Sequence, residues 1–328
     1  MRIALILAAL AAVAALVLPA HAQNARSWVA SSGNDLNPCT RTQPCASFSR
    51  ALSQTNAGGE INCVDQSDYA LGANIAIVKS ITIDCESVQA RFGLASAGIQ
   101  AIIVEASASD VVTLRGLDID GNNLSGIGIM FASGGALHIE KCVIRNFDTT
   151  SFNGAGIADS LLIGSTSELF VSDTLVTNNG TGTPGAGILV NPFVTSTVKV
   201  SLNRVEARGN FFGIKADATQ VSGGVIQMTI RDSVSSGNTS NGIVATGNAS
   251  GPAIVMMIDR STSSHNAAGF GVIADGPKTT IRLGGSSIAG NINGVGVSNG
   301  GVLQSYGTNQ INGNSNDGIA ALTPIGLH

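Results

Sequence analysis

The sequence predicts an all-β fold: a single-stranded parallel β-helix, or solenoid, of about ten or eleven rungs with a short N-terminal capping helix. One pattern returns eight times from about residue 110 onward: an apolar residue, an asparagine eight positions later, and then a glycine followed by an aliphatic residue. Repeats of 23 to 32 residues are typical of solenoids, in which each repeat stacks on its neighbours. The asparagine position is filled by Asn122, Asn179, Asn210, Asn238, Asn266, Asn291 and Asn314, and once by Phe147.

The two apolar parts of the repeat each begin a strand. The residues eight positions before the asparagine are Leu114, Ile139, Val171, Leu202, Ile230, Ile258, Leu283 and Tyr306. The glycine–aliphatic pairs are Gly126-Ile127, Gly156-Ile157, Gly187-Ile188, Gly213-Ile214, Gly242-Ile243 and Gly318-Ile319. A β-sandwich also alternates short strands, but it would not hold one asparagine at one corner.

The repeated asparagine has a structural role in this interpretation. Asparagine tolerates the left-handed backbone of a sharp corner at lower cost than most residues. Its amide both donates and accepts, so stacked copies can bond along the solenoid axis as a ladder. A polar stripe that binds a ligand is the alternative, and the ladder is favoured.

The N-terminus has the features of a secretory signal. Arg2 supplies the positive start, Ile3–Leu18 the apolar segment, and Ala20-His21-Ala22 a cleavage site, so residues 1–22 are predicted to be removed near Ala22. No later stretch is long and apolar enough to span a bilayer. We therefore expect a secreted or periplasmic protein.

A cap is predicted at residues 23–59, before a solenoid at residues 60–328. A first strand is expected at Trp28-Val29, and Cys45–Thr55 is expected to form an amphipathic helix that Gly58-Gly59 ends. Such a helix can cover the open apolar end of a solenoid. Its apolar positions are Phe48, Ala51 and Leu52.

Five cysteines in an exported chain indicate disulfides. Cys39 and Cys45 lie on either side of a short loop. Cys63 and Cys85 end two similar strands, and on neighbouring rungs their Cα atoms would lie about 4.8 Å apart, within disulfide range. A stack of free thiols is the alternative. Cys142 is expected to be a small buried residue.

The start of the chain resembles exported right-handed parallel β-helix proteins of the pectin-lyase-like superfamily. The resemblance rests on Val29, Gly33, Asn34, Asp35, Gly58, Gly59, Glu60 and Ile61. It implies a right-handed solenoid. Polysaccharide lyases of this fold use grouped acidic residues to bind calcium and a basic residue to abstract a proton. No catalytic motif of these enzymes is present, so no catalytic residue carries over.

Charged residues recur just after the apolar position. Six positions before the asparagine, the sign alternates through Lys141, Asp173, Arg204, Asp232 and Arg260. One position earlier, Arg115 is followed by Glu140, and Arg231 by Asp259. If the rungs stack in register, opposite charges face each other, so we expect structural ion pairs. A catalytic interpretation of Arg231, Asp232, Asp259 and Arg260 is the weaker alternative.

The sequence gives no support for a metal site. Asp118, Asp120 and Asn122 resemble the start of a calcium loop, but Asn123 and Ile129 stand where glycine and glutamate are needed. The histidines after the leader do not cluster. No cofactor is expected, and calcium has no motif.

Two longer rungs between Phe147 and Asn210 indicate where a partner could bind. The extra residues, within Asp148–Gly156 and Asn179–Gly187, follow one corner and would raise a rim beside a groove. The binding candidates are Phe211, Phe212, Asn153 and Thr183.

Composition narrows the choice of partner. With Arg2 removed, 16 basic and 21 acidic residues remain, which gives no electrostatic reason to expect nucleic acid. Two hypotheses follow. The first is a non-catalytic surface, matrix or polysaccharide-binding module, and the second is a lyase, hydrolase or epimerase acting on acidic polysaccharide. End-to-end self-association is a further expectation, because no cap is evident near Pro324.

Overall fold

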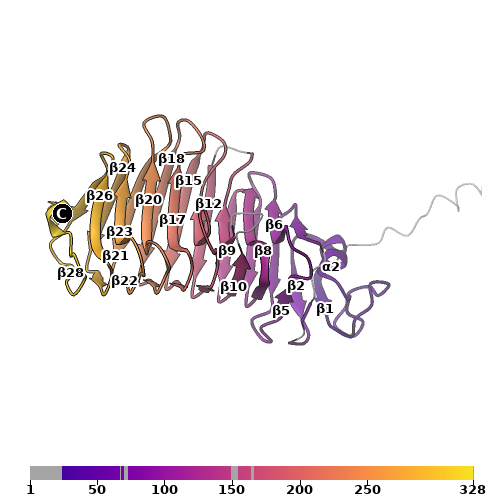
Figure 1. Cartoon of the computed structure of the whole chain (residues 1–328). Coiled ribbons are helices and arrows are strands. Elements are labelled where there is room, and N and C mark those ends of the chain that lie inside the picture. The colour runs from indigo at the N-terminus through magenta and orange to yellow at the C-terminus, as the bar shows by residue number, and fades with distance from the viewer. Residues whose placement is uncertain (1–23, 67, 70–72, 149–153, 164–165, 328) are drawn as a thin grey trace, which may run out of the picture.

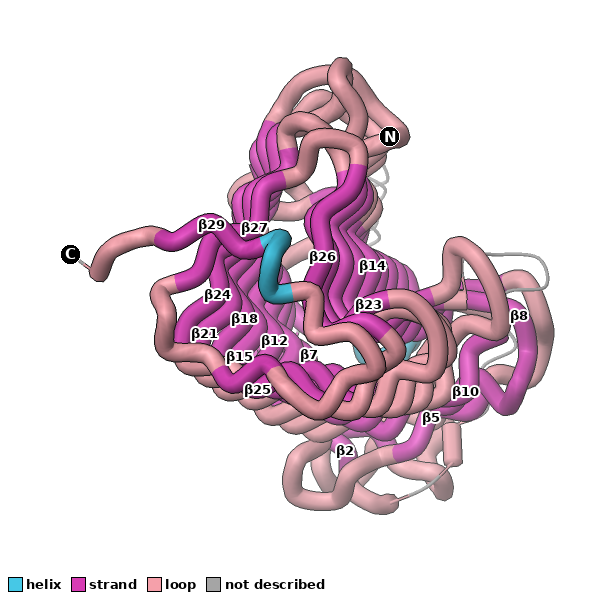
Figure 2. The backbone as a smooth tube through the Cα atoms, turned by 60° about the vertical axis from the view of Figure 1, so that its left-hand side comes forward, coloured by secondary structure: helices cyan, strands magenta, loops and turns pink. Residues whose placement is uncertain are grey.

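The chain forms an elongated parallel β-solenoid (Figure 1). The computed structural model describes residues 24–66, 68–69, 73–148, 154–163 and 166–327. The signal predicted at residues 1–22 lies outside these residues. Three sheets, here named A, B and C, enclose one continuous apolar core (Figure 2).

Sheet A contains twelve strands among the described residues, all paired in parallel. They are β1 (Asn24–Val29), β2 (Thr55–Cys63), β4 (Ile81–Asp84), β7 (Val111–Arg115), β9 (Ala136–Glu140), β12 (Thr166–Ser172), β15 (Thr197–Asn203), β18 (Val225–Arg231), β21 (Ala253–Asp259), β24 (Thr279–Gly284), β27 (Val302–Ser305) and β29 (Leu322–Pro324).

Sheets B and C complete each rung, and they share the long strand β8 (Asp118–Ser133), which runs through the corner between them. Sheet B also contains β5 (Arg91–Gly93), β10 (Val143–Asp148), β13 (Leu175–Thr177), β16 (Glu206–Arg208), β19 (Val234–Ser236), β22 (Thr262–Ser264), β25 (Ser287–Ala289) and β28 (Gln310–Ile311). Sheet C also contains β3 (Ile75–Ile77), β6 (Ile99–Glu105), β11 (Ala155–Asp159), β14 (Ala186–Val190), β17 (Phe212–Ala218), β20 (Ile243–Gly247), β23 (Phe270–Asp275) and β26 (Asn293–Ser298). About nine rungs of the described chain are therefore complete, fewer than the ten or eleven predicted, and the predicted parallel β-helix is confirmed.

The apolar row of sheet A agrees with the sequence pattern except at its end. Leu114, Ile139, Val171, Leu202, Ile230, Ile258 and Leu283 are buried in register. Leu283, however, pairs with Ser305, and not with Tyr306. The last rung has one extra residue between strand and asparagine, and a shift of one residue turns a side chain to the other face. Tyr306 therefore lies on the outer surface.

The predicted alignment of the earliest rung is also wrong, by two residues. Phe147 pairs with Leu124, and Ile157 pairs with Ile129, so neither Asn122 nor Ile127 occupies the predicted position. Asn122 is exposed and donates its side-chain amide to the carbonyl of Leu94. The bulge in β8 at this corner accounts for the shift.

The other six asparagines form the ladder. The side-chain amide of each one donates to the amide oxygen of the next, over 3.0 Å for Asn179 to Asn210, and 3.3, 2.8, 2.8 and 2.9 Å for the steps that follow to Asn314. Asn314 ends the column by donating to Asp317 over 2.9 Å. Each of these oxygens also accepts a backbone N–H from the preceding rung, as in Asn210 to Asn238 at 3.0 Å.

The left-handed backbone lies one residue earlier than predicted. The residue just before each of these asparagines has a φ between 54° and 72°, namely Asn178, Gly209, Gly237, His265, Gly290 and Gly313. The tight corner is thus made by its preceding residue. This leaves the asparagine free to turn its amide inward along the stack.

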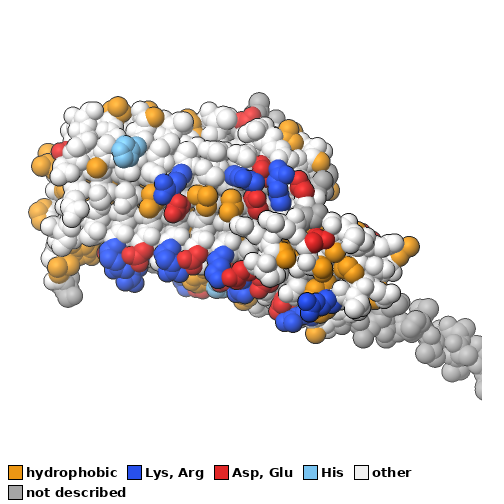
Figure 3. Space-filling model, turned by 90° about the horizontal axis from the view of Figure 1, so that it is seen from below, with side chains coloured by type: hydrophobic (Ala, Val, Ile, Leu, Met, Phe, Trp, Pro, Cys, Tyr) orange, Lys and Arg blue, Asp and Glu red, His pale blue; other side chains and the backbone are white. Residues whose placement is uncertain are grey.

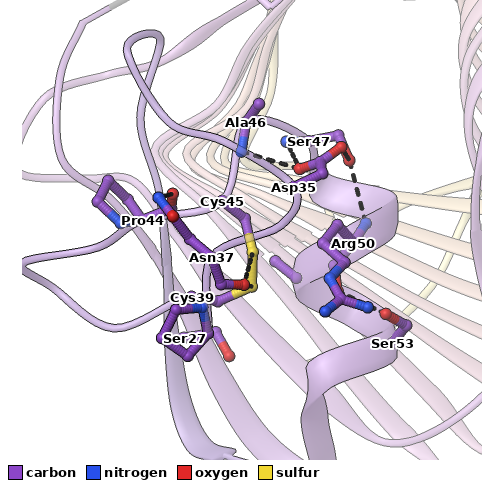
Figure 4. The surroundings of a disulfide bond; sticks show 12 residues. Ser27, Asp35, Asn37, Cys39, Pro44, Cys45, Ala46, Ser47, Arg50 and Ser53 are labelled. Carbon is purple, nitrogen blue, oxygen red and sulfur yellow. Dashed lines mark hydrogen bonds between the residues drawn. A yellow bond between two sulfur atoms is a disulfide. The ribbon is translucent and has the colours of Figure 1, made fainter.

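The N-terminal cap closes the first edge of sheet A. The helix α2 (Phe48–Gln54) is shorter than predicted, and Gly58-Gly59 lie inside β2, so they do not end it. The side chain of Asp35 accepts from the backbone N–H groups of Ala46 and Ser47, at 2.9 Å each (Figure 4). A Cβ on Gly33 would lie 2.1 Å from the carbonyl oxygen of Cys45, so only glycine fits this turn.

The loop that contains Cys39 and Cys45 forms backbone hydrogen bonds with the free edge of β1. The N–H of Trp28 donates to the carbonyl of Cys39 over 2.9 Å, and the N–H of Cys45 donates to the carbonyl of Trp28 over 3.0 Å. Cys39 is bonded to Cys45, and Cys63 to Cys85 across adjacent strands with a Cα–Cα distance of 4.9 Å. Cys142 is buried and free.

Removing the disulfide between Cys63 and Cys85 should lower the free energy of unfolding by about 3 kcal/mol. The bond closes 22 residues, against 6 for the bond between Cys39 and Cys45, so more chain entropy is lost from the unfolded state. Urea unfolding of the two Cys→Ala double variants tests this. A larger loss for the Cys39–Cys45 pair would contradict it.

The C-terminal end of the solenoid differs from the prediction. The 3-10 helix Ile319–Ala321 stands where Gly318-Ile319 was predicted to start a strand, and Ile319 is exposed. The short strand β29 then pairs with β27. No helix of the described chain is long and apolar enough to cross a membrane.

Candidate functional site

The outer face of sheet A holds the residues best placed for binding. Alternate residues of each strand point outward because the others fill the core. One register position gives a central row along this face, namely His138, Phe170, Ser201, Thr229, Met257, Arg282 and Gln304. At its start the rings of His138 and Phe170 stack, with centroids 4.7 Å apart and planes 10° apart.

A column of charged residues runs along the corner between sheets A and B. Lys141, Asp173, Arg204, Asp232 and Arg260 all follow a sheet A strand and have φ between 45° and 53°. The left-handed corner turns each side chain toward the neighbouring rungs. Basic and acidic side chains accordingly alternate in a line along the molecule (Figure 3).

Two candidate catalytic residues, Asp232 and Arg260, belong to this column, and they form ion pairs with the other two, Arg231 and Asp259, which end the strands before them. Arg260 makes two hydrogen bonds of 2.9 Å to the carboxylate of Asp232 and one of 2.8 Å to Asp259. Arg231, whose side chain is 55% exposed, lies 3.6 Å from Asp232 and 3.7 Å from Asp259.

The same pairing is found in earlier rungs, with one difference from the prediction. Arg204 binds Asp173 through two hydrogen bonds of 2.6 and 2.7 Å, and Arg115 bonds to both Asp84 and Glu140. Lys141 pairs with Glu86, not with Asp173 above it. Close pairs therefore form between particular neighbours, and the column is not one uniform chain of contacts.

Pairing makes these groups poor proton-transfer agents. The hydrogen bond to Asp232 raises the pKa of Arg260, and the hydrogen bond from Arg260 lowers the pKa of Asp232. Both shifts favour the charged forms, whereas a general base or acid works best with a pKa near the operating pH.

A cavity of about 420 Å³ opens beside this group. Its wall includes Tyr306, whose ring lies over Gly284: a Cβ there would be 3.1 Å from Cδ2 of the tyrosine. The absence of a side chain at Gly284 thus makes room for the ring. The cavity is lined by Met257, Asp259, Arg260, Gly284, Gly285, Tyr306, Thr308 and Leu327.

A second cavity of about 220 Å³ lies on the same face. Its lining includes Phe170, Ser201 and Thr229 of the central row, with Glu168 and Lys199 beside them. Thr229 pairs in register with Met257 of the first cavity. The two cavities therefore lie next to each other on the outer face of sheet A, and we call this stretch with its two cavities the trough.

The predicted binding residues lie elsewhere. Phe211 and Phe212 contact each other edge-to-face, with centroids 4.7 Å apart, and Phe212 packs on the outer apolar cluster of sheet C. Thr183 is exposed in the loop before β14, and Asn153 lies outside the described residues. The structure does not bring Phe211, Phe212 and Thr183 together with the charged candidates.

The sequence did not identify Tyr306 as a residue of the candidate site, and it did not reveal an ion pair in sheet C. The side chains of Lys215 and Asp217 are nearly buried and joined over 2.8 Å, and the Lys215 ammonium lies 4.9 Å from the centre of the Phe212 ring. The signal for Tyr306 was present, since it was the single polar ring in a row of aliphatic residues.

The described ranges hold no group of three or more His, Cys, Asp or Glu side chains placed to bind a metal ion. The acids of the charged column are separated by the arginines that pair with them.

Comparison with known proteins identifies the type of solenoid. Residues 100–283, more than half of the chain, match the family described as "Right handed beta helix region". No curated protein matches the chain in sequence.

Similar solved structures include a rhamnogalacturonan lyase (13% identity, TM-score 0.48, 82% of each chain covered) and pectate lyase Pel9A (14%, 0.47, 89% of this chain and 80% of that one). The Dettilon tailspike protein is similar at 11% identity and a TM-score of 0.49, over 84% of this chain and 63% of its own. At these identities the likeness concerns the fold alone.

Proposed function

The chain belongs to the right-handed β-helix family, and we propose that it is an exported, non-catalytic module that binds polysaccharide on the outer face of sheet A. Two disulfides fit an extracellular location, because such bonds persist in oxidising compartments.

The observation that carries the proposal is the pairing of every candidate catalytic charge. Arg260 is held by two carboxylates, and Arg231 lies between the same two. A lyase or epimerase needs a basic group free to take a proton from the substrate. Here the hydrogen bond to Asp232 raises the pKa of Arg260 and so stabilises its protonated form.

The trough has the side chains that a polysaccharide-binding surface needs, although its charged residues are not suited to catalysis. Its two cavities combine rings, Tyr306 and Phe170, with hydroxyl groups such as Ser201 and Thr229. Concave sites that mix apolar faces with a few polar groups are the usual places for ligands. An extended polymer could contact both cavities at once.

Replacing Tyr306 with alanine should weaken polysaccharide binding about tenfold, because the variant loses the ring that walls the larger cavity. Affinity electrophoresis with a set of soluble polysaccharides measures the change. Phe193→Ala is the matched control, since Phe193 is an exposed aromatic residue that lines neither cavity.

Two results would overturn the proposal. One is a loss of binding in Phe193→Ala with none in Tyr306→Ala. The other is shortening of the bound polysaccharide by the wild-type chain that Arg231→Ala or Asp232→Ala abolishes.

A further inference from the structure

The charges in the trough determine what kind of polysaccharide it can accept. The larger cavity is lined by one acid and one base, Asp259 and Arg260, which bond to each other over 2.8 Å. The smaller is likewise lined by Glu168 and Lys199, joined over 2.8 Å. Each lining therefore carries no net charge, and its cation is already occupied.

A uronate carboxylate would find no free partner in either cavity. Arg260 already donates to Asp232 and Asp259, so an incoming carboxylate would have to displace one acid and lie beside the other. Like charges at such distances repel. The chain as a whole is also acidic, with a net charge of −4, which does not attract a polyanion.

The remaining lining suits sugar hydroxyl groups. Ser201, Thr229 and Thr308 carry hydroxyls that both donate and accept, and Gln227 has an amide that does the same. The rings of Phe170 and Tyr306 offer apolar faces near the two ends of this stretch.

We propose that the ligand is an uncharged polysaccharide, an inference that rests on the proposed binding function. The two cavities, as distinct from Arg282 of the central row, which donates to Gln304, would thus distinguish polymers by charge: they accept hydroxyl-rich neutral chains and reject polyuronates. Binding should also depend little on ionic strength, since it includes no new ion pair.

A matched pair of probes tests the ligand class. The full chain is titrated with polygalacturonate and with its fully methyl-esterified form, which keeps the backbone and removes the charge, and also with neutral galactan, glucan and mannan. The expected result is binding of the ester or of a neutral glycan at least about tenfold tighter than polygalacturonate, unchanged at high salt. Equal or tighter binding of polygalacturonate would overturn this inference while leaving the binding function intact. Failure of every probe to bind would overturn the binding function itself.

A charge-changing variant gives an independent result. Glu168→Gln leaves Lys199 unpaired in the smaller cavity, so polygalacturonate should bind about fivefold tighter than to the wild-type chain. Glu105→Gln, with the same charge change at an exposed position in sheet C, should have no effect. Equal gains in both variants would mean that overall charge, not the trough, controls binding.

Discussion

Replacing Asp159 with asparagine is expected to raise the free energy of unfolding by about 4 kcal/mol at about pH 8 and to change it little at about pH 4. Asp159 ends β11 and points into the core, where it pairs in register with Phe131 and Val190. It is fully buried, and burial raises the pKa of its carboxyl to about 7. The nearby Ser167 hydroxyl favours the ionised form, but neither carboxyl oxygen makes a hydrogen bond within the described structure, so burial dominates.

The sign of the pH dependence follows from that shift. The unfolded chain loses this proton near pH 4, whereas the folded chain keeps it until about pH 7. The contribution of Asp159 to stability is therefore fully present below the unfolded pKa and is lost as pH rises through this window. The asparagine side chain does not ionise, so the variant lacks this dependence of stability on pH. Urea unfolding of both proteins across the window, with Glu105→Gln as an exposed control, measures the difference. Parallel pH profiles for wild type and Asp159→Asn would contradict the account.

Replacing Asn238 with alanine should lower the free energy of unfolding by about 3 kcal/mol or more. Its amide oxygen accepts from both the backbone N–H and the side chain of Asn210, and its nitrogen donates to Asn266 over 2.8 Å. Asn238 is fully buried, so the change leaves the backbone N–H of Asn210 without a partner and removes one hydrogen bond from each neighbouring ladder amide.

Asn312→Ala is the control for that measurement, because Asn312 is exposed at a corner outside the ladder. It should change stability by less than about 0.5 kcal/mol. Chemical unfolding followed by far-ultraviolet circular dichroism gives both values. Equal effects of the two variants would show that the ladder adds nothing to stability.

Most of the architecture could be predicted because one period sets the core, the corner and the next strand together. The prediction failed where a rung departs from that period. The bulge in β8 displaced Asn122 and Ile127 by two residues, and one added residue turned Tyr306 outward. The spacing of residues in the sequence does not show where a rung contains an extra residue. Only the pairing of strands across rungs reveals such an insertion.

The candidate site was predicted only in part for a related reason. The alternating charges could be recognised from their spacing, and most of them do meet. The cavities could not be recognised in the sequence, because they are formed by side chains from different rungs, such as Tyr306 over Gly284. Asp159 was missed because an acid near a corner gives no sign in the sequence that it points inward.

The most direct test of the central claim is the length of a polysaccharide after the wild-type chain has bound it. Size-exclusion chromatography of bound neutral and uronate-containing polymers, with and without calcium, gives that length. Binding with unchanged length, in wild type and in Arg231→Ala alike, is the predicted result. Shortened chains or unsaturated products that disappear in Arg231→Ala would show that the paired charges form an active site.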